Sequence, residues 1–157
     1  MAASCASATR LKRGRRATLA PVTAAPERTR ALPAYRLRFQ ERPGYLYAHV
    51  QGEEDSFDIT RDYWLAIAGE CARRGTRSLL VLDELTADPA TREELERLVP
   101  SLVGLGFEGM RIAFVEPHSA RVALVEHAEL LARELGYTVR VFGEFSAADL
   151  WLRHGEV

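Results

Sequence analysis

Residues 78–94 read Ser-Leu-Leu-Val-Leu-Asp-Glu-Leu-Thr-Ala-Asp-Pro-Ala-Thr-Arg-Glu-Glu, the part of the sequence with the strongest structural signals. The continuous apolar run Leu79–Leu82 predicts a strand that is covered on both faces. The run stops at Asp83. Thr91 and Glu94 then have the Ser/Thr-x-x-Glu spacing of a capping box, which predicts that a helix begins next to Thr91. The stretch therefore predicts a buried strand, a short polar loop and a helix.

The chain before this stretch predicts a hairpin and a helix. Apolar and polar residues alternate over residues 35–40 and again over residues 45–51, with the turn signal Arg-Pro-Gly at 42–44 between them. This pattern is typical of two antiparallel strands. Thr60 is the expected N-cap of a helix that runs towards Gly75.

The chain after this stretch continues the alternation of helix and strand. The helix from Arg92 contains Pro100, which should kink or split it. The later elements are a strand over 111–116, a helix capped by Ser119 and ended by Gly136, a strand over 138–142, and a helix opened by Ser146 and Asp149. The resulting order is β-β-α-β-α-β-α-β-α. It predicts a single-domain α/β fold with a mixed, mostly parallel sheet and right-handed crossovers.

The composition is that of one globular domain with an acidic folded part. The chain has 157 residues, 47% of them apolar and 27% charged, which suffices for a sizeable core. Residues 1–34 hold seven of the 21 basic side chains and one of the 22 acidic ones, so residues 35–157 carry 14 basic and 21 acidic groups. This acidic balance disfavours nucleic acid as a partner.

Residues 1–34 are predicted to be a disordered basic extension, and residues 35–157 the folded domain. The extension is rich in Ala, Ser, Thr, Arg and Pro and has no hydrophobic period. An organellar transit peptide and a twin-arginine signal at Arg15 and Arg16 stay open as alternatives, although Pro21 and Pro26 interrupt the apolar stretch that an export signal requires. A start codon assigned too far upstream would give the same pattern.

The cysteines and the hydropathy favour a cytoplasmic protein with no membrane partner. Cys5 and Cys71 do not form a disulfide framework and suit a reducing compartment. Cys71 falls on the inward side of its expected helix, which favours a buried and inert thiol. No apolar run approaches the roughly 18 residues that a bilayer-spanning helix needs.

The order of the elements and the closing segment resemble the STAS domain, named from sulfate transporters and anti-sigma-factor antagonists. Residues 141–152 read Val-Phe-Gly-Glu-Phe-Ser-Ala-Ala-Asp-Leu-Trp-Leu. They are similar to the ending of the bacterial stand-alone branch of this family, a strand, an aromatic residue and a helix close to Ala-x-x-Trp-Leu. The resemblance covers about residues 35–153. It implies a STAS-like fold and a non-enzymatic regulatory module that docks a protein partner.

In the anti-sigma antagonists, the loop after the central strand carries an Asp-Ser-Ser/Thr-Gly motif whose serine is phosphorylated by a partner kinase. Here residues 83–86 read Asp-Glu-Leu-Thr and residues 88–91 read Asp-Pro-Ala-Thr, with neither serine nor glycine. The resemblance makes Thr91 the candidate phosphoacceptor, with Thr86 as the other hydroxyl in reach. Glu93 and Glu94 would repel a phosphate on Thr91, and a plain helix cap is the alternative role of that residue.

The loop over residues 83–91 is the candidate partner or ligand site, because ligands gather beyond the carboxyl ends of parallel strands. Its candidate residues carry carboxylates or hydroxyls: Asp83, Glu84, Thr86, Asp88 and Thr91. His118 is a secondary candidate, because it follows the strand over 111–116 in the same way.

Three functions are compatible with these residues. The leading hypothesis is a non-enzymatic module that docks a protein partner through residues 83–91. The alternative is a carrier with an apolar pocket for a small ligand or lipid beneath the helix at Pro100, by analogy with the related CRAL-TRIO lipid-binding fold. The third is an enzyme that uses Asp83, Glu84 and His118 in one cleft.

The sequence predicts neither a cofactor nor a metal. Residues 104–109 match Gly-x-Gly-x-x-Gly, but they follow a helix instead of a strand, which predicts a turn. The four histidines fall in separate elements, and the one lysine of the chain, Lys12, lies in the extension. A phosphate-loop lysine is therefore missing from the expected domain.

Overall fold

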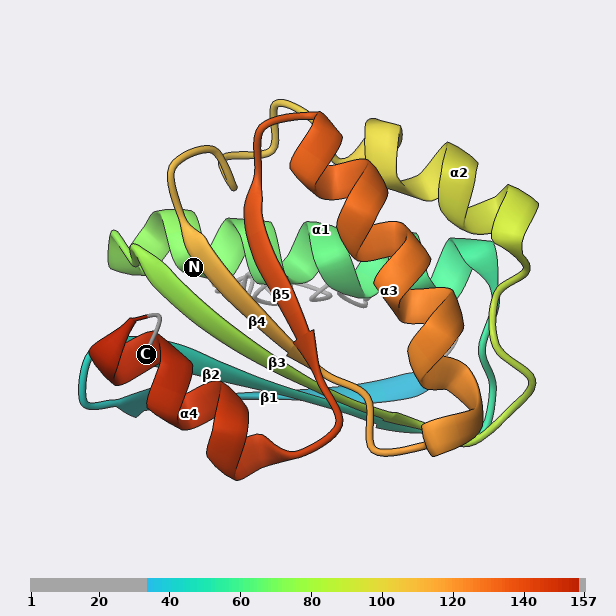
Figure 1. Ribbon diagram of the computed structural model, residues 1–157, viewed down its shortest axis with the longest axis horizontal. Helices are drawn as coiled ribbons and strands as arrows, with labels where there is room; N and C mark the ends of the chain where they lie inside the picture. Colours follow the sequence, from blue (N-terminus) through green and yellow to red (C-terminus); the bar gives the residue numbers. More distant parts are fainter. Residues whose placement is uncertain (1–33, 156–157) are drawn as a thin grey trace, which may run out of the picture. The chain divides into compact units, whose positions relative to one another are not determined.

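The computed structural model describes residues 34–155, so the prediction for residues 1–34 lies outside the described residues except at Ala34. The order of the elements is the predicted one (Figure 1). The strands are β1 (Tyr35–Arg42), β2 (Tyr45–Gly52), β3 (Ser78–Leu85), β4 (Arg111–Val115) and β5 (Thr138–Phe142). The helices are α1 (Phe57–Arg74), α2 (Arg92–Ser101), α3 (Ser119–Glu134) and α4 (Phe145–His154).

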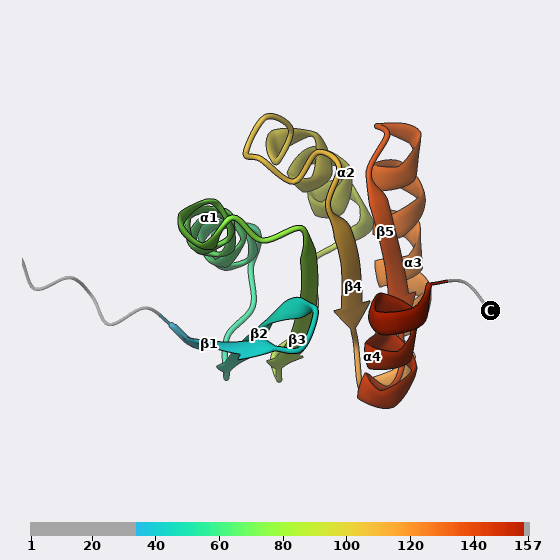
Figure 2. The same cartoon turned by 90° about the vertical axis from the view of Figure 1, so that its left-hand side faces the viewer.

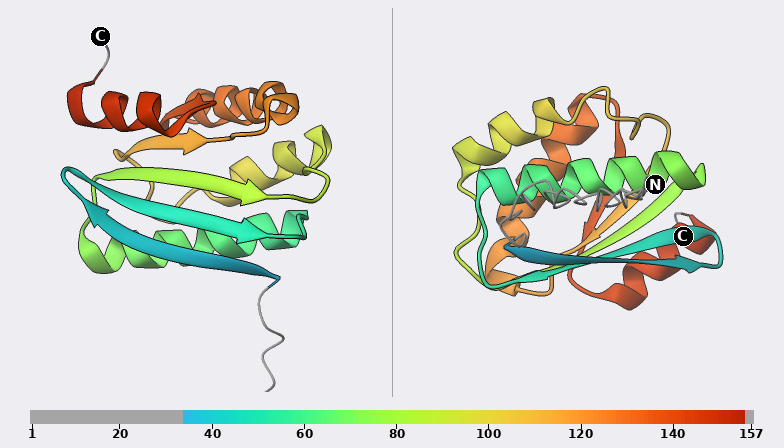
Figure 3. Two further views of the ribbon diagram at one scale, coloured as in Figure 1. Left: turned by 90° about the horizontal axis from the view of Figure 1, so that it is seen from below. Right: turned by 180° about the vertical axis from the view of Figure 1, so that it is seen from behind.

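The five strands form one sheet in the order β1-β2-β3-β4-β5. The strands β1 and β2 pair antiparallel, and every other neighbouring pair is parallel, which confirms the predicted hairpin and the mostly parallel sheet. Gly44 closes the hairpin turn with φ of 90°, a conformation that glycine adopts without strain. Figure 3 (left) shows this hairpin at one edge of the sheet.

Three helices lie on one face of the sheet and α4 lies on the other (Figure 1). From β2 to β5 each crossover moves one strand further in the same direction, and right-handed crossovers that never reverse place all their helices on one face. Figure 2 shows α2 between α1 and α3 on this face. The chain crosses to the opposite face after β5, where α4 packs.

The core has a part on each face of the sheet, and β3 contributes to both. Leu79 and Val81 pack under α1, whereas Leu80 packs under α4. All three side chains have no exposed surface. This double burial explains the continuous apolar run, since a strand covered on both faces needs apolar residues at successive positions.

The first helix begins earlier than predicted. Its N-cap is Ser56, whose side chain accepts a hydrogen bond from Ile59 N, so the prediction of Thr60 as the cap is wrong. Thr60 is buried and its hydroxyl donates to Asp55 at 3.0 Å. Both residues have the hydroxyl that a cap needs, and local sequence alone does not separate them.

Two other predicted side-chain caps are also wrong. The N-cap of α3 is His118 and that of α4 is Glu144, and neither side chain makes a capping hydrogen bond. The predicted box partner in α4, Asp149, instead accepts a hydrogen bond from Tyr45 Oη at 2.6 Å. A tertiary contact to β2 has therefore replaced the local one.

Pro100 lies in the last turn of α2, which ends one residue later. It therefore marks the end of the helix and does not split it. The glycine-rich segment that follows is a turn, as predicted: Gly104 and Gly106 have positive φ, and the Glu108 carboxylate accepts hydrogen bonds from both of their backbone N–H groups. Over residues 34–155, no helix combines the length and the apolar character that crossing a bilayer requires.

Candidate functional site

The segment 83–91 is only partly a loop. The strand β3 runs on to Leu85, where it pairs with Gly52 of β2, so the prediction that Asp83 and Glu84 lie in a loop is wrong. Neighbouring strand residues point to opposite faces. Asp83 consequently points to the face under α1 to α3, and Glu84 to the face that carries α4.

The true loop after β3 covers residues 86–91, and its backbone is held in place. Thr86, Asp88 and Thr91 are exposed. Arg121 of α3 donates from Nη1 to the Leu85 carbonyl at 2.7 Å and from Nη2 to the carbonyl of Ala87. The loop therefore presents polar side chains on a backbone that α3 anchors.

Thr91 has the predicted capping role. Its hydroxyl accepts from Glu94 N at 3.2 Å, and the Glu94 carboxylate accepts from Thr91 N at 2.7 Å, which completes the capping box. Its phosphorylation stays a prediction. The local geometry gives a phosphate on Thr91 a carboxylate as an immediate neighbour, which opposes it by like charge.

Replacing Thr91 with Ala is expected to lower the free energy of unfolding by about 1 kcal/mol, because one N–H of the first turn of α2 loses its acceptor. Thr91→Ser is the matched control and should keep most of that stability, since it retains the hydroxyl. Urea unfolding of the three proteins measures the difference. Equal midpoints for the Ala and Ser variants would contradict the capping role.

Asp83 is a buried carboxylate with two donors. Its side chain is 7% exposed. One oxygen accepts from Tyr63 Oη at 2.9 Å, and the other accepts from Leu85 N at 2.9 Å. Burial raises the pKa of Asp83 to about 6, against the lowering effect of these two hydrogen bonds. The desolvation of the carboxylate thus outweighs its hydrogen bonds.

Two further carboxylates lie close to Asp83, each of them directly beyond a parallel strand. Asp55 follows β2 and Glu116 follows β4, and both add to the rise in the pKa of Asp83. Burial raises the pKa of Asp55 too, while Thr60 and Arg121 act in the opposite direction. Glu116 is 3% exposed. The carboxyl ends of three neighbouring strands thus bring three acids together.

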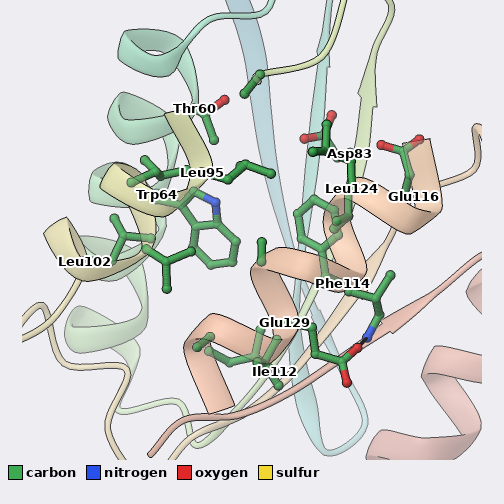
Figure 4. Close-up of a pocket in the computed structure, with 18 of the residues that line it drawn as sticks. Thr60, Trp64, Asp83, Leu95, Leu102, Ile112, Phe114, Glu116, Leu124 and Glu129 are labelled. Atoms are coloured by element: carbon green, nitrogen blue, oxygen red, sulfur yellow. Dashed lines mark hydrogen bonds between the residues drawn. The ribbon is translucent and has the colours of Figure 1, made fainter. Parts of the chain in front are cut away.

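These acids form one end of a cavity of about 140 Å³ under α1, α2 and α3. Figure 4 shows Thr60, Asp83 and Glu116 towards one end of the cavity, and Glu129 at the other end with its carboxylate bonded to the backbone. That bond runs from Val141 N to Glu129 Oε2 at 2.7 Å. Glu129 is therefore occupied in fixing β5 to α3.

Most of the remaining cavity wall is apolar. Aromatic rings line it on the side of α1 and the sheet: Trp64 lies 6.2 Å from Phe114, nearly parallel to it, and 5.4 Å from Phe107, edge to face. Aliphatic side chains from α2, β4, β5 and α3 complete the wall: Leu95, Leu98, Val99, Leu102, Ile112, Leu124, Val125, Val139 and Val141. The result is an apolar chamber with an acidic end.

Helix α3 covers this chamber without a close fit. Although Leu124, Val125 and Ala128 line the cavity, no residue of α3 counts as buried. A helix that covers a sheet usually buries one full stripe of side chains. Leu124, Val125 and Ala128 are half-buried and line the cavity.

The three residues of the enzyme hypothesis are not brought together in one cleft. Asp83 lines the cavity, whereas Glu84 and His118 do not. Glu84 accepts hydrogen bonds on the opposite face, from Gln51 at 3.1 Å and from His49 Nε2 at 2.5 Å if that atom carries a proton. His118 contacts Glu116 Oε1 through Nδ1 at 2.8 Å.

Neither a metal site nor a reactive thiol is evident in the described part of the chain. Over residues 34–155, no three His, Cys, Asp or Glu side chains have an arrangement that could hold a metal ion. Cys71 is 4% exposed, and burial raises the pKa of its thiol to about 11. This agrees with the prediction of a buried thiol, which would stay protonated near neutral pH.

Sequence reasoning found Asp83 but missed its partners in the cavity. Asp55 and Glu116 follow strands in the same way as the predicted site loop, and applying the strand-end rule to every parallel strand would have found both. Tyr63 and Arg121 gave no such signal, because an amphipathic helix commonly carries a tyrosine or an arginine. Their roles depend on how α1 and α3 pack on the sheet.

No protein-family model matches this chain, and no curated protein sequence matches it significantly. The resemblance to the STAS domain consequently stays a prediction.

Proposed function

We propose that this domain is a binding protein for a small, largely apolar molecule, which it holds in the cavity under α1, α2 and α3. The observation that supports this most directly is the mainly apolar cavity of about 140 Å³ between these helices and the sheet. Ligand sites in proteins are typically concave and mostly apolar, with a small number of polar groups that orient the ligand. This cavity has that composition, because its carboxylates gather at one end.

The size of the chamber limits the ligand. An engineered apolar cavity of about 150 Å³ binds benzene, whereas sites for drug-sized molecules are about 300 to 1,000 Å³. The 140 Å³ of this chamber corresponds to one six-membered ring or a short branched chain. A lipid with long acyl chains exceeds it. Of the small-ligand and lipid carriers that the sequence left open, the proposal therefore keeps the small-ligand carrier.

Toluene is expected to bind with a dissociation constant in roughly the millimolar range, given the binding energy available to about seven heavy atoms. The measurement is the fluorescence of Trp64, which lines the cavity, in a Trp151→Phe background that leaves Trp64 as the one remaining tryptophan. Toluene should change the Trp64 emission and raise the midpoint of thermal unfolding.

Two alanines of α3 provide the matched pair of variants for this test. Ala128 lines the cavity, whereas Ala123 is exposed on the same helix. Ala128→Leu should fill part of the chamber and remove toluene binding while the domain stays folded, and Ala123→Leu should leave binding unchanged. The proposal fails if toluene has no effect on the parent protein, or if both variants bind it equally.

Docking of a protein partner is a second candidate, and the anchored loop over residues 86–91 supports it. Thr86, Asp88 and Thr91 are exposed on a backbone that Arg121 fixes, and such a preorganised polar surface suits recognition. Asp83 does not belong to that surface, because it is buried. Ala90 of the same loop lines the cavity, so a ligand would contact the loop from the inside.

A further inference from the structure

We infer that the ligand of this cavity is a small organic cation: an amine on a single ring or a short chain, with its ammonium group facing Asp55, Asp83 and Glu116. This inference rests on the proposed function and adds the charge of the ligand. Three observations support it: the negative charge at one end of the cavity, the hydrogen bonds that Arg121 already makes there, and the apolar lining of the rest of the cavity.

The acidic end of the cavity carries more negative than positive charge. Asp55, Asp83 and Glu116 contribute three carboxyl groups, and among residues 34–155 Arg121 is the one basic residue that lines the cavity. Two of the carboxyls, those of Asp83 and Glu116, are less than a tenth exposed. Buried charges of one sign in a low-dielectric site attract an opposite charge far more strongly than they would in water.

Arg121 does not satisfy this negative charge by hydrogen bonding. Its guanidinium donates to the main-chain carbonyls of Leu85 and Ala87, which commits two of its donors to holding the loop. It acts on Asp55 as a nearby charge that lowers the pKa of that carboxyl. Arg121 therefore contributes positive charge near the acids but none of the hydrogen bonds that they accept.

The acids also have accepting capacity to spare. A carboxylate can accept about four hydrogen bonds. Asp83 uses one on each oxygen. Glu116 takes both of its hydrogen bonds, from His118 N and His118 Nδ1, on Oε1, while Oε2 accepts none from residues 34–155. An ammonium group supplies three donors, so it can use acceptor capacity that the protein leaves free.

The contact of Glu116 with His118 does not remove this demand. His118 Nδ1 lies 2.8 Å from Glu116 Oε1, and His118 N donates to the same oxygen. His118 itself does not line the cavity, whereas Glu116 does. Both contacts are on Oε1, so they leave Oε2 of Glu116 available to a ligand.

The apolar remainder of the cavity selects the body of the cation. Behind the acids, Trp64 and Phe114 present aromatic surface, and Leu95 and Ile112 present aliphatic surface. A hydrated metal ion or a polar polyamine would leave this surface unfilled, whereas an anion would meet three acids. In a monoamine with one ring, the ammonium group can contact the acidic end of the cavity while the ring contacts the apolar wall.

The test compares three probes of nearly equal size and shape on the full chain at pH 7.5: benzylamine, benzyl alcohol and benzoate. Isothermal titration calorimetry and the Trp64 fluorescence assay measure the three dissociation constants. Benzylamine is expected to bind about tenfold or more tightly than benzyl alcohol, the gain typical of a charge-assisted contact. Benzoate is expected not to bind.

Glu116→Gln is the main variant, because Gln keeps an oxygen for the hydrogen bonds from His118 and removes the charge. It should weaken benzylamine about tenfold and leave benzyl alcohol unchanged, so the alcohol also reports that the cavity is intact. Glu84→Gln is the matched control on the opposite face of the sheet and should change neither constant. Asp55→Asn provides a second test if Glu116→Gln does not fold.

The outcomes separate the two proposals. If benzyl alcohol and toluene bind but benzylamine binds no better than the alcohol, the cavity is a ligand site and the inference about the cation is wrong. The inference is also wrong if Glu116→Gln weakens both probes equally, since that would show a structural effect. If none of the probes and not even toluene binds, the proposed function fails together with the inference.

Discussion

Replacing Asp83 with Asn should make the domain more stable at pH 8, by about 2 to 3 kcal/mol, although it removes a buried side chain with two hydrogen bonds. The pKa of Asp83 is about 6 in the folded protein, against 3.8 as its ordinary value. The folded state therefore binds the proton of Asp83 more tightly than the unfolded chain does. Above pH 6 the buried carboxyl of the folded state is ionised, which lowers the stability of the domain.

The sign of the effect follows from proton linkage. Below pH 3.8 the carboxyl is neutral in both states, and Asp83 behaves like Asn. As the pH rises from 3.8 to about 6, the unfolded chain loses the proton first, so the wild type loses stability over this window. The difference between wild type and variant should thus be near zero at pH 3.5 and reach its full value above pH 6.

The groups that face Asp83 support this direction. Tyr63 of α1 and the backbone N–H of Leu85 donate to the carboxylate, whereas Asp55 and Glu116 repel its negative charge. Arg121 is the base at this end of the cavity, and its hydrogen bonds go to main-chain carbonyls. In the variant, the Asn oxygen can accept from Leu85 N and the Asn amide can donate to Tyr63 Oη. Both contacts can persist, and the Tyr63 O–H gives up its present acceptor.

Urea unfolding at pH values from 3.5 to 8 measures the effect, and Glu84→Gln is the matched control. Glu84 is the next residue of β3 but lies on the other face, where the hydrogen bond with His49 lowers its pKa. Its carboxylate stabilises the domain above the ordinary pKa, so Glu84→Gln should lose stability at pH 8. If Asp83→Asn also loses stability at pH 8, the Asp83 carboxylate stabilises the folded domain as a hydrogen-bond acceptor, and the prediction is wrong.

A buried carboxylate that lowers stability, such as that of Asp83, indicates a functional role. Destabilised, desolvated charges gather at functional sites, where the stability they cost is exchanged for binding or catalysis. At this site, a cation in the cavity would restore most of the stability that the buried Asp83 carboxylate removes, because it places a positive charge next to that carboxylate. Asp83→Asn should accordingly stabilise the empty protein and weaken the binding of benzylamine.

The sequence predicted the elements of the fold well because their signals are local and repeated. The apolar runs Leu79–Leu82 and 112–115 identified the two central strands, and the capping box at Thr91 placed the start of α2 correctly. The alternation of strands and helices after the hairpin predicted the mostly parallel sheet, because parallel neighbours need a crossover between them. Each of these inferences uses residues close together in the chain.

The site could be predicted only in part, because it depends on contacts between distant segments. Asp83 appeared to end a strand, since a carboxylate inside a buried strand is rare unless it is paired. Its partner, Tyr63, lies 20 residues earlier in the chain, and the cavity needs α3 above the sheet. A hydropathy pattern reports which side chains face inward, but it carries no information on whether they fill the space.

Replacing Trp64 with Ala is expected to lower the free energy of unfolding by about 3 kcal/mol. The ring of Trp64 contacts three others, with centroid distances of 5.9 Å to Tyr63, 5.4 Å to Phe107 and 6.2 Å to Phe114. Its removal takes away these contacts and joins the space left by the indole to the existing chamber of about 140 Å³. Urea unfolding measures the loss, and Trp64→Leu is the milder variant if the Ala variant is largely unfolded.

Added indole should restore much of that stability, because the enlarged chamber is open to the ring that was removed. The thermal midpoint of Trp64→Ala should rise with indole concentration, and more steeply than that of the wild type. Leu80→Ala is the matched control: it removes a side chain with no exposed surface on the opposite face of the sheet, at a similar cost of about 2 to 5 kcal/mol, but leaves a space too small for indole. Equal responses of the two variants to indole, or no response of Trp64→Ala, would show that Trp64 does not form the wall of a chamber that accepts ligands.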